Sequence, residues 1–263
     1  PDPSPSEPQP QPQPQPTPVE PALPKVVANW SGSSVSHTEA AARELHAVRL
    51  DTGEPDHTEL WMIQLNQLTD HRPDKLIRGR IPRVLASDEF DANMVEFDFG
   101  RATLTPGVWS LDLTDDNLFH WGEGSTTTPQ REVWESAAHE PRTGPPAAEL
   151  LRAPWAVMLA PLEGHGLRHF VVSLDEQGQL HASVGACVLK GKLRPLPPSD
   201  WFDLVFGLSN CGGPDDSTTL RGVGKLVRLG APVGGWTPLR FIGAALTPDG
   251  KSGMSFSGKP TLQ

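Results

Sequence analysis

The sequence predicts an all-β fold, an antiparallel β-barrel of roughly eight or more strands or a barrel-like sandwich, preceded by a disordered or extended Pro-rich arm. Short runs of alternating apolar and polar residues recur, with turn residues between them. Helical periodicity is weak, and 25 Gly and 29 Pro among 263 residues favour many tight turns. A barrel is preferred because closure leaves no exposed strand edge.

The Pro-rich arm occupies residues 1–28. Of residues 1–24, 11 are Pro, and Pro alternates with Gln through the middle of this segment. Such a sequence cannot form a helix or a central strand, because Pro fixes φ and lacks an N–H donor. We expect a polyproline II spacer that reaches roughly 75 Å. Two interpretations of the arm remain open. It is either a plain linker or a docking peptide that binds an aromatic-lined groove of a partner through Pro8, Pro10, Pro12, Pro14 and Pro16.

The body, residues 29–263, is predicted to form one barrel domain. In VEFDFG, for example, Val95, Phe97 and Phe99 share one face of a strand. Turn sequences such as DTGE, TPGV, DEQGQ and TPDGK separate the runs. Strands are expected at residues 44–50, 60–65, 95–99, 108–113, 155–159, 169–174, 187–193, 202–208, 220–229, 239–246 and 253–257.

Residues 125–152 interrupt this rhythm. They are interpreted as a long insertion or as the join between two sheet modules. Short helices are expected at residues 130–139 and 146–152, the second with Pro146 in its first turn.

Two cysteines, Cys187 and Cys211, flank a predicted hairpin whose turn contains PLPPSD. A turn centred on Ser199 places both cysteines 12 residues from the centre and therefore opposite each other. The same register pairs Leu193 with Val205. The pattern favours a disulfide over two free thiols, worth roughly 3 kcal/mol in the chain-entropy model, and over a metal site, since no CxxC or nearby His completes a ligand set. A disulfide indicates an extracytoplasmic location.

Charge and hydropathy narrow the classes of partner. The formal net charge is −10, which argues against a nucleic-acid-binding surface and against electrostatic docking on anionic lipid. No run of 18 apolar residues exists, so no membrane-spanning helix is predicted.

The C-terminal half carries a family resemblance in GQLHASVGACVLKGKL, FDLVFGLSNCG and FIGAALTPDGKSGMSFSG. These segments resemble a group of uncharacterised bacterial exported proteins and lipoproteins with a small disulfide-containing barrel. The matching positions are Cys187, Gly191, Leu193, Cys211 and Gly222. The resemblance implies an exported barrel and no activity. The arm is similar to the segment that follows the lipidated Cys of many bacterial lipoproteins, which implies an outer-membrane anchor and a place in the periplasm or at the cell surface.

Chemistry-bearing motifs are missing from the sequence: it has no GxSxG, P-loop or HExxH motif. We therefore predict no catalytic, cofactor-binding or metal-binding residues. Eight Trp residues accompany zero Tyr. Trp61, Trp109 and Trp201 alternate with residues expected to face inward, which indicates an outer stacking surface for sugars or a partner; the alternative is that they belong to the barrel core or plug its ends.

Taken together, these features predict a non-catalytic extracytoplasmic binding or structural subunit of a bacterial envelope or cell-surface assembly. Its expected partners are other envelope or surface proteins, reached through the Pro-rich arm, with no nucleic acid and with membrane contact only through an N-terminal lipid anchor. One alternative is a lipocalin-like carrier of a small apolar ligand. A second is an envelope polysaccharide or peptidoglycan hydrolase, which requires paired carboxylates or a Ser/His pair in a cleft.

Overall fold

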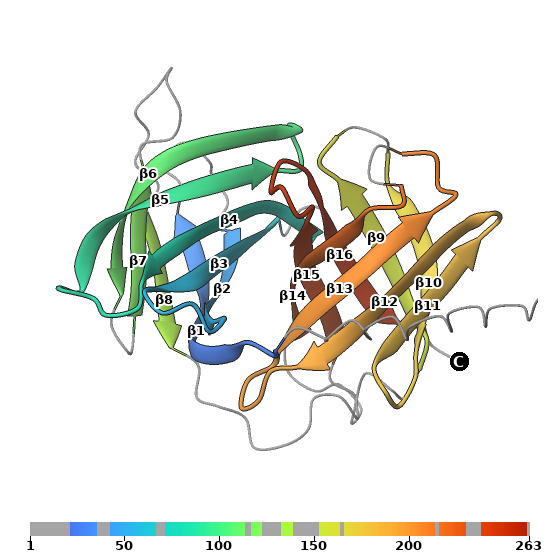
Figure 1. Cartoon of the computed structure of the whole chain (residues 1–263), viewed down its shortest axis with the longest axis horizontal. Helices are drawn as coiled ribbons and strands as arrows, with labels where there is room; N and C mark the ends of the chain where they lie inside the picture. Colours follow the sequence, from blue (N-terminus) through green and yellow to red (C-terminus); the bar gives the residue numbers. More distant parts are fainter. Residues whose placement is uncertain are drawn as a thin grey trace, which may run out of the picture.

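The chain folds into two closed antiparallel β-barrels of eight strands each, which lie side by side (Figure 1). The structure is a computed structural model that describes residues 22–35, 43–66, 72–113, 117–122, 133–138, 153–163, 166–213, 216–229 and 238–261. The first barrel comprises β1 (Lys25–Val35), β2 (Arg43–Asp51), β3 (His57–Asn66), β4 (Arg72–Pro82), β5 (Glu89–Asp98), β6 (Thr103–Leu113), β7 (Asn117–Gly122) and β8 (Val133–Ala138). The second comprises β9 (Trp155–Pro161), β10 (Arg168–Leu174), β11 (Gln179–Val184), β12 (Cys187–Pro195), β13 (Trp201–Ser209), β14 (Thr219–Arg228), β15 (Leu239–Leu246) and β16 (Gly253–Pro260).

Each barrel is an up-and-down meander in which every strand pairs with its neighbours in sequence. Pairing of β1 with β8 closes the first barrel, and pairing of β9 with β16 closes the second. The predicted all-β barrel class is confirmed, and each predicted run overlaps a strand. The structure has two barrels, whereas the sequence analysis predicted a single barrel domain. Eight strands enclose an interior that side chains can fill, whereas one barrel of sixteen strands would leave a wide channel.

Within residues 125–152, β8 closes the first barrel by pairing with β1, and β9 begins the second barrel three residues after this stretch. The helix predicted at residues 130–139 is wrong, because β8 is a strand whose residues Val133–Ala138 pair with β1. Its Val and Trp residues suit a strand better than a helix. Residues 146–152 lie outside the described part of the chain. The arm ends earlier than residue 28, since β1 begins at Lys25.

Two apolar clusters fill the barrel interiors. The first barrel encloses Trp30, Met62, Trp109 and neighbouring aliphatic side chains. The second is filled largely by aromatic rings, among which Phe241 stacks on Phe256 at 5.5 Å and meets Phe202 edge-on at 5.7 Å between ring centroids. Such edge-on and offset contacts are the favoured geometries of aromatic pairs.

A third apolar cluster lies between the barrels and draws on both. Ile63 and Val48 of the first barrel and Ile242 and Ala244 of the second are each 0% exposed in it. The strands that meet here are buried on both faces, as in β3 and β15, because one face lines a barrel and the other contacts the neighbouring barrel. Strand β4 contacts β15 and β16 across this boundary (Figure 1).

Hydrogen bonds between described residues also cross the boundary between the barrels. Ser255 Oγ of β16 donates to the carbonyl of Pro73 at 3.0 Å. Lys225 Nζ of β14 donates to Ser31 Oγ of β1 at 2.7 Å. The barrels therefore share an apolar core. Beside it, these hydrogen bonds form a polar seam, and the described chain is one packed unit.

The predicted disulfide between Cys187 and Cys211 is confirmed, with an S–S distance of 2.05 Å. The hairpin register is one residue away from the predicted one: Leu193 faces Leu204 and Gly191 faces Phe206. Strand pairing stops at Ser209, and Asn210 takes a left-handed conformation with φ 57°. This local turn brings Cys211 across to Cys187 despite the shifted register.

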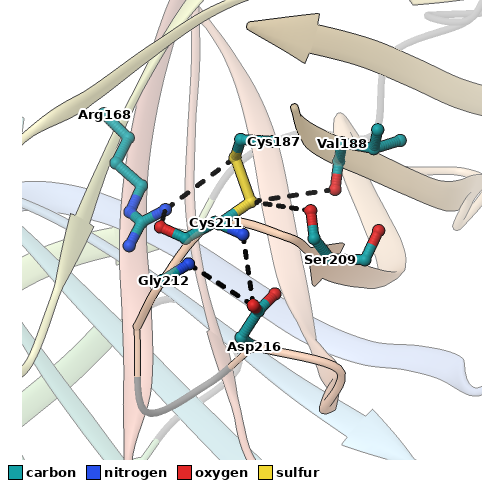
Figure 2. Close-up of a disulfide and its surroundings, with 7 residues drawn as sticks. All are labelled: Arg168, Cys187, Val188, Ser209, Cys211, Gly212 and Asp216. Atoms are coloured by element: carbon teal, nitrogen blue, oxygen red, sulfur yellow. Dashed lines mark hydrogen bonds between the residues drawn. A yellow bond between two sulfur atoms is a disulfide. The ribbon is translucent and has the colours of Figure 1, made fainter. Parts of the chain in front are cut away.

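Polar groups hold the chain around this disulfide in place (Figure 2). Arg168 Nη1 donates to the Cys211 carbonyl at 2.7 Å, and Asp216 Oδ2 accepts from the Cys211 and Gly212 amides at 3.2 and 3.3 Å. The disulfide closes the open end of the β12–β13 hairpin, and the hydrogen bonds of Arg168 and Asp216 connect it to β10 and to the loop before β14. A disulfide is compatible with an oxidising, extracytoplasmic location.

The shared core predicts a position-specific loss of stability. Replacing Ile242, buried between the barrels, by Ala is expected to lower the free energy of unfolding by about 3 kcal/mol, because it removes buried methyl groups and leaves a cavity. Val171→Ala, at a position 57% exposed on β10, is the control and should change it by less than about 0.5 kcal/mol. Guanidinium titration of both variants measures the difference, and equal losses would contradict the shared core.

The disulfide predicts a second loss of stability. The double variant Cys187→Ala/Cys211→Ala is expected to lose about 3 kcal/mol in the chain-entropy model, since the open loop regains entropy when the chain unfolds. Reducing the wild-type protein should cause the same loss. The reductant should leave the double variant unchanged, which serves as the control in a urea titration.

Candidate functional site: the cleft between the barrels

A cleft of about 690 Å³ opens where the outer faces of the two barrels diverge. Strands β3 and β4 of the first barrel form one wall, and β12, β13 and β14 of the second form the other. This volume lies within the range of about 300–1,000 Å³ that ligand-binding clefts usually have.

The wall from the first barrel carries a fixed ion pair. Trp61 on β3 faces Arg78 on β4, and Glu59 lies two residues before Trp61 on the same strand. Glu59 accepts from Arg78 Nη2 at 2.7 Å and from Trp61 Nε1 at 3.0 Å. The Arg78 guanidinium lies 4.8 Å from the Trp61 ring centroid, a cation–π distance. Each of these three side chains therefore contacts the other two.

The wall from the second barrel is basic. Arg194 on β12 faces Asp203 on β13 and donates to Oδ2 from Nε at 2.9 Å and from Nη2 at 2.5 Å. Arg221 on β14 lies 3.5 Å from Oδ1 of the same carboxylate. Asp203 is buried, whereas the Arg221 side chain is 46% exposed. Lys192 lines the same wall.

Charge is divided unevenly along the chain. Residues 155–263 carry 10 Lys and Arg against 8 Asp and Glu, whereas residues 1–154 carry 12 against 24. The basic wall of the cleft therefore belongs to the basic part of an otherwise acidic protein. Such a surface attracts anionic groups.

The Pro-rich arm joins the body at this cleft. Ala22 and Pro24, the residues that precede β1, both line it. Ala22 is exposed and Pro24 is buried. Whatever binds the arm is therefore brought next to the cleft.

A chain of four polar side chains crosses the barrel boundary beside the apolar core. Lys225 Nζ donates to Ser31 Oγ at 2.7 Å, and Ser31 Oγ lies 2.7 Å from His46 Nδ1. His46 Nε2 lies 2.7 Å from Glu44 Oε1. All bonds are satisfied when Nε2 carries the proton, so that Ser31 donates to Nδ1 and Nε2–H donates to Glu44. His46 and Lys225 are 3% and 4% exposed.

This serine, histidine and carboxylate are connected like a hydrolase triad, and no motif in the sequence predicted them. The surroundings of Ser31 differ from those of a nucleophile. It lies within β1, paired on one side with His46 and on the other with Ala137, so that backbone amides along these described strands serve the sheet. An oxyanion hole needs backbone or side-chain donors aimed at the reacting oxygen. Lys225 instead uses the Ser31 oxygen as an acceptor that compensates for burial of its ammonium.

One carboxylate near the barrel boundary has a displaced pKa. Burial raises the pKa of Asp74 to about 6, and Asp98 adds to the rise, while Arg43 and Lys75 oppose it. Asp74 Oδ2 accepts from Arg43 at 2.5 Å, whereas Oδ1 is buried with no hydrogen-bond partner among the described residues. Desolvation outweighs the ion pair because one of the two oxygens stays unsatisfied.

The three Trp residues predicted as an outer stacking surface are buried. Trp61 and Trp201 do lie on the outer faces of their barrels, but the neighbouring barrel covers them, leaving 4% and 0% exposed. Trp109 packs inside the first barrel and is 5% exposed. None of the three rings is available as a broad external stacking surface. The predicted docking prolines, Pro8, Pro10, Pro12, Pro14 and Pro16, lie outside the described residues.

The interior of the second barrel offers little room for a ligand. It contains an apolar cavity of about 60 Å³, bordered by rings such as Phe206 and Phe256. A drug-sized ligand needs about 300 Å³ or more.

Comparison with protein families, with curated proteins and with solved structures found no match. Within the described ranges, His, Cys, Asp and Glu form no group of three or more that could hold a metal ion. No helix in the described part of the chain could cross a lipid bilayer.

Asp74 predicts a pH dependence of stability. Its folded-state pKa of about 6 lies above the ordinary value of 3.8, so the folded state binds the proton more tightly. The free energy of unfolding should therefore decrease as the pH rises from about 4 to about 6, and this group contributes up to about 3 kcal/mol to the decrease. Asp74→Asn should remove that part of the slope in urea titrations across this range.

Asp51 serves as the control, because its pKa is shifted in the direction opposite to that of Asp74. Hydrogen bonds from Arg83 and from the Gly53 amide lower its pKa to about 2. Its stabilising effect is therefore present above pH 4 and is lost as the pH falls toward 2. Asp51→Asn should leave the slope between pH 4 and 6 nearly as in the wild type. A wild-type slope that survives in Asp74→Asn would contradict the assignment.

Proposed function

We propose that this protein is a non-catalytic binding or structural subunit of a bacterial envelope or cell-surface assembly, tethered through its Pro-rich arm. The observation that carries the proposal is the junction of that arm with the cleft, where Ala22 and Pro24 lie among charged side chains of both barrels. A partner that binds the arm close to this junction would also contact the cleft. Its expected class is another envelope or surface protein.

The location rests on the disulfide and on the resemblance to bacterial exported proteins and lipoproteins. Disulfides persist in oxidising compartments, of which the periplasm and the cell surface are the bacterial examples. A lipid anchor ahead of the arm would hold the protein at the outer membrane, with the arm as a spacer.

Two other functions have less support. A lipocalin-like carrier needs an open lumen, and the second barrel holds a cavity of about 60 Å³. A cavity of about 450 Å³ lies beside Trp30 and Leu113 of the first barrel, but the charged Arg49, Arg83 and Asp88 border it, which suits an apolar ligand poorly. An envelope polysaccharide or peptidoglycan hydrolase needs an accessible nucleophile or acid pair. The Ser31–His46–Glu44 arrangement lies at the barrel boundary, and its serine is engaged by the buried Lys225.

Co-purification from native envelopes tests the proposal. Wild-type protein, extracted in mild detergent after crosslinking, is expected to elute in a complex well above its own 28.4 kDa. Replacing Pro8, Pro10, Pro12, Pro14 and Pro16 by Ala should abolish the complex, since it destroys the polyproline II conformation at constant length. Arg221→Glu, in the cleft wall, should weaken it.

Lys259→Glu is the matched control, because Lys259 is exposed at the far end of β16. It should leave the complex unchanged. Elution of every variant and of the wild type as a lone chain would contradict the proposal.

A further inference from the structure

The last residues of the Pro-rich arm are part of the cleft wall. Pro24 is buried there, Ala22 lines the same cleft, and Lys25 starts β1. The described chain therefore begins at the cleft, and the residues that precede Ala22 in the sequence are attached there. Their chemistry determines whether the cleft wall can bind them.

The arm and the wall opposite it have complementary charge. Residues 1–24 carry three acidic residues, Asp2, Glu7 and Glu20, and no Lys or Arg. Among the described lining residues of the second barrel, three are basic (Lys192, Arg194 and Arg221) and one, the buried Asp203, is acidic. An acidic segment thus leaves the body beside a basic surface.

Chain geometry keeps Glu20 close to that surface. It lies two residues before Ala22, and two residues of fully extended chain span at most about 7 Å. It also precedes Pro21, which biases it toward an extended conformation. Its carboxylate therefore has a short reach that is centred on the cleft.

Arg221 has the capacity to accept such a partner. Its side chain is 46% exposed, and its contact with Asp203 is long, at 3.5 Å. A guanidinium carries five N–H donors and binds carboxylates in a bidentate manner. Asp203 meanwhile takes two shorter bonds from Arg194.

We propose that the basic wall of the cleft binds the C-terminal end of the chain's own Pro-rich arm, with the Glu20 carboxylate docked against Lys192, Arg194 and Arg221. Because the arm is covalently attached at the cleft, its effective concentration there is high, and a modest ion pair suffices to hold it. This inference goes beyond the proposed function and does not rest on it.

Nuclear spin relaxation of the ¹⁵N-labelled full-length chain tests this docking. In the wild type at low salt, the amides of Val19, Glu20 and Ala22 are expected to have order parameters near 0.85, as in a rigid backbone. Glu20→Gln should lower those of Val19 and Glu20 below about 0.6, and Arg221→Gln should change them in the same direction. Glu7→Gln, which removes the same charge farther from the cleft, is the matched control and should have no effect.

Values below about 0.6 in the wild type, or equal values in wild type and Glu20→Gln, would overturn the proposal. Titration with poly-L-glutamate distinguishes an external occupant. If the arm occupies the wall, Glu20→Gln should bind the polymer several-fold more tightly than the wild type, monitored at the Arg221 Nε–Hε signal. Equal binding would mean that the wall takes an external acidic chain, and it would also overturn the proposal. No envelope partner enters either measurement, so its outcome is independent of the co-purification test.

Discussion

The apolar contact between the outer faces of the two barrels is the interaction on which the rest of the structure depends. Ile63 and Val48 meet Ile242 and Ala244 there with no exposed surface left. Burial of these side chains holds one barrel against the other, since removing apolar area from water is the main favourable contribution to such a contact. The cleft exists because its two walls belong to different barrels, and the arm leaves the body at the place where those walls diverge.

A polar seam beside this core gives the contact an orientation. An apolar surface tolerates small shifts, whereas the hydrogen bond from the buried Lys225 to Ser31 tolerates few. His46 and Glu44 continue the chain toward solvent and place a carboxylate at its far end. We interpret this chain as the element that fixes how the barrels are seated, because a buried ammonium without its acceptors would be costly.

Local features could be predicted from the sequence, and pairing between distant strands could not. The disulfide followed from one hairpin and its turn, and its register was missed by one residue because Asn210 adopts a left-handed conformation. The number of barrels depends on whether β8 returns to β1, about a hundred residues away, and no local pattern encodes that. Ser31 and His46 meet only because β1 and β2 pair. The runs LWMIQL and FIGAAL did carry a signal of the boundary, because continuous apolar strands are buried on both faces.

The relative orientation of the barrels in solution is the most direct test, because the cleft, the seam and the arm junction all require it to be fixed. Residual dipolar couplings of backbone amides, collected in a dilute aligned medium, report it without any substitution. Couplings from strands β1–β6 and from strands β9–β16 are expected to fit a single alignment tensor with the barrels placed as in Figure 1. Two tensors of different magnitude would mean that the barrels move independently, and the shared core described above would then be wrong.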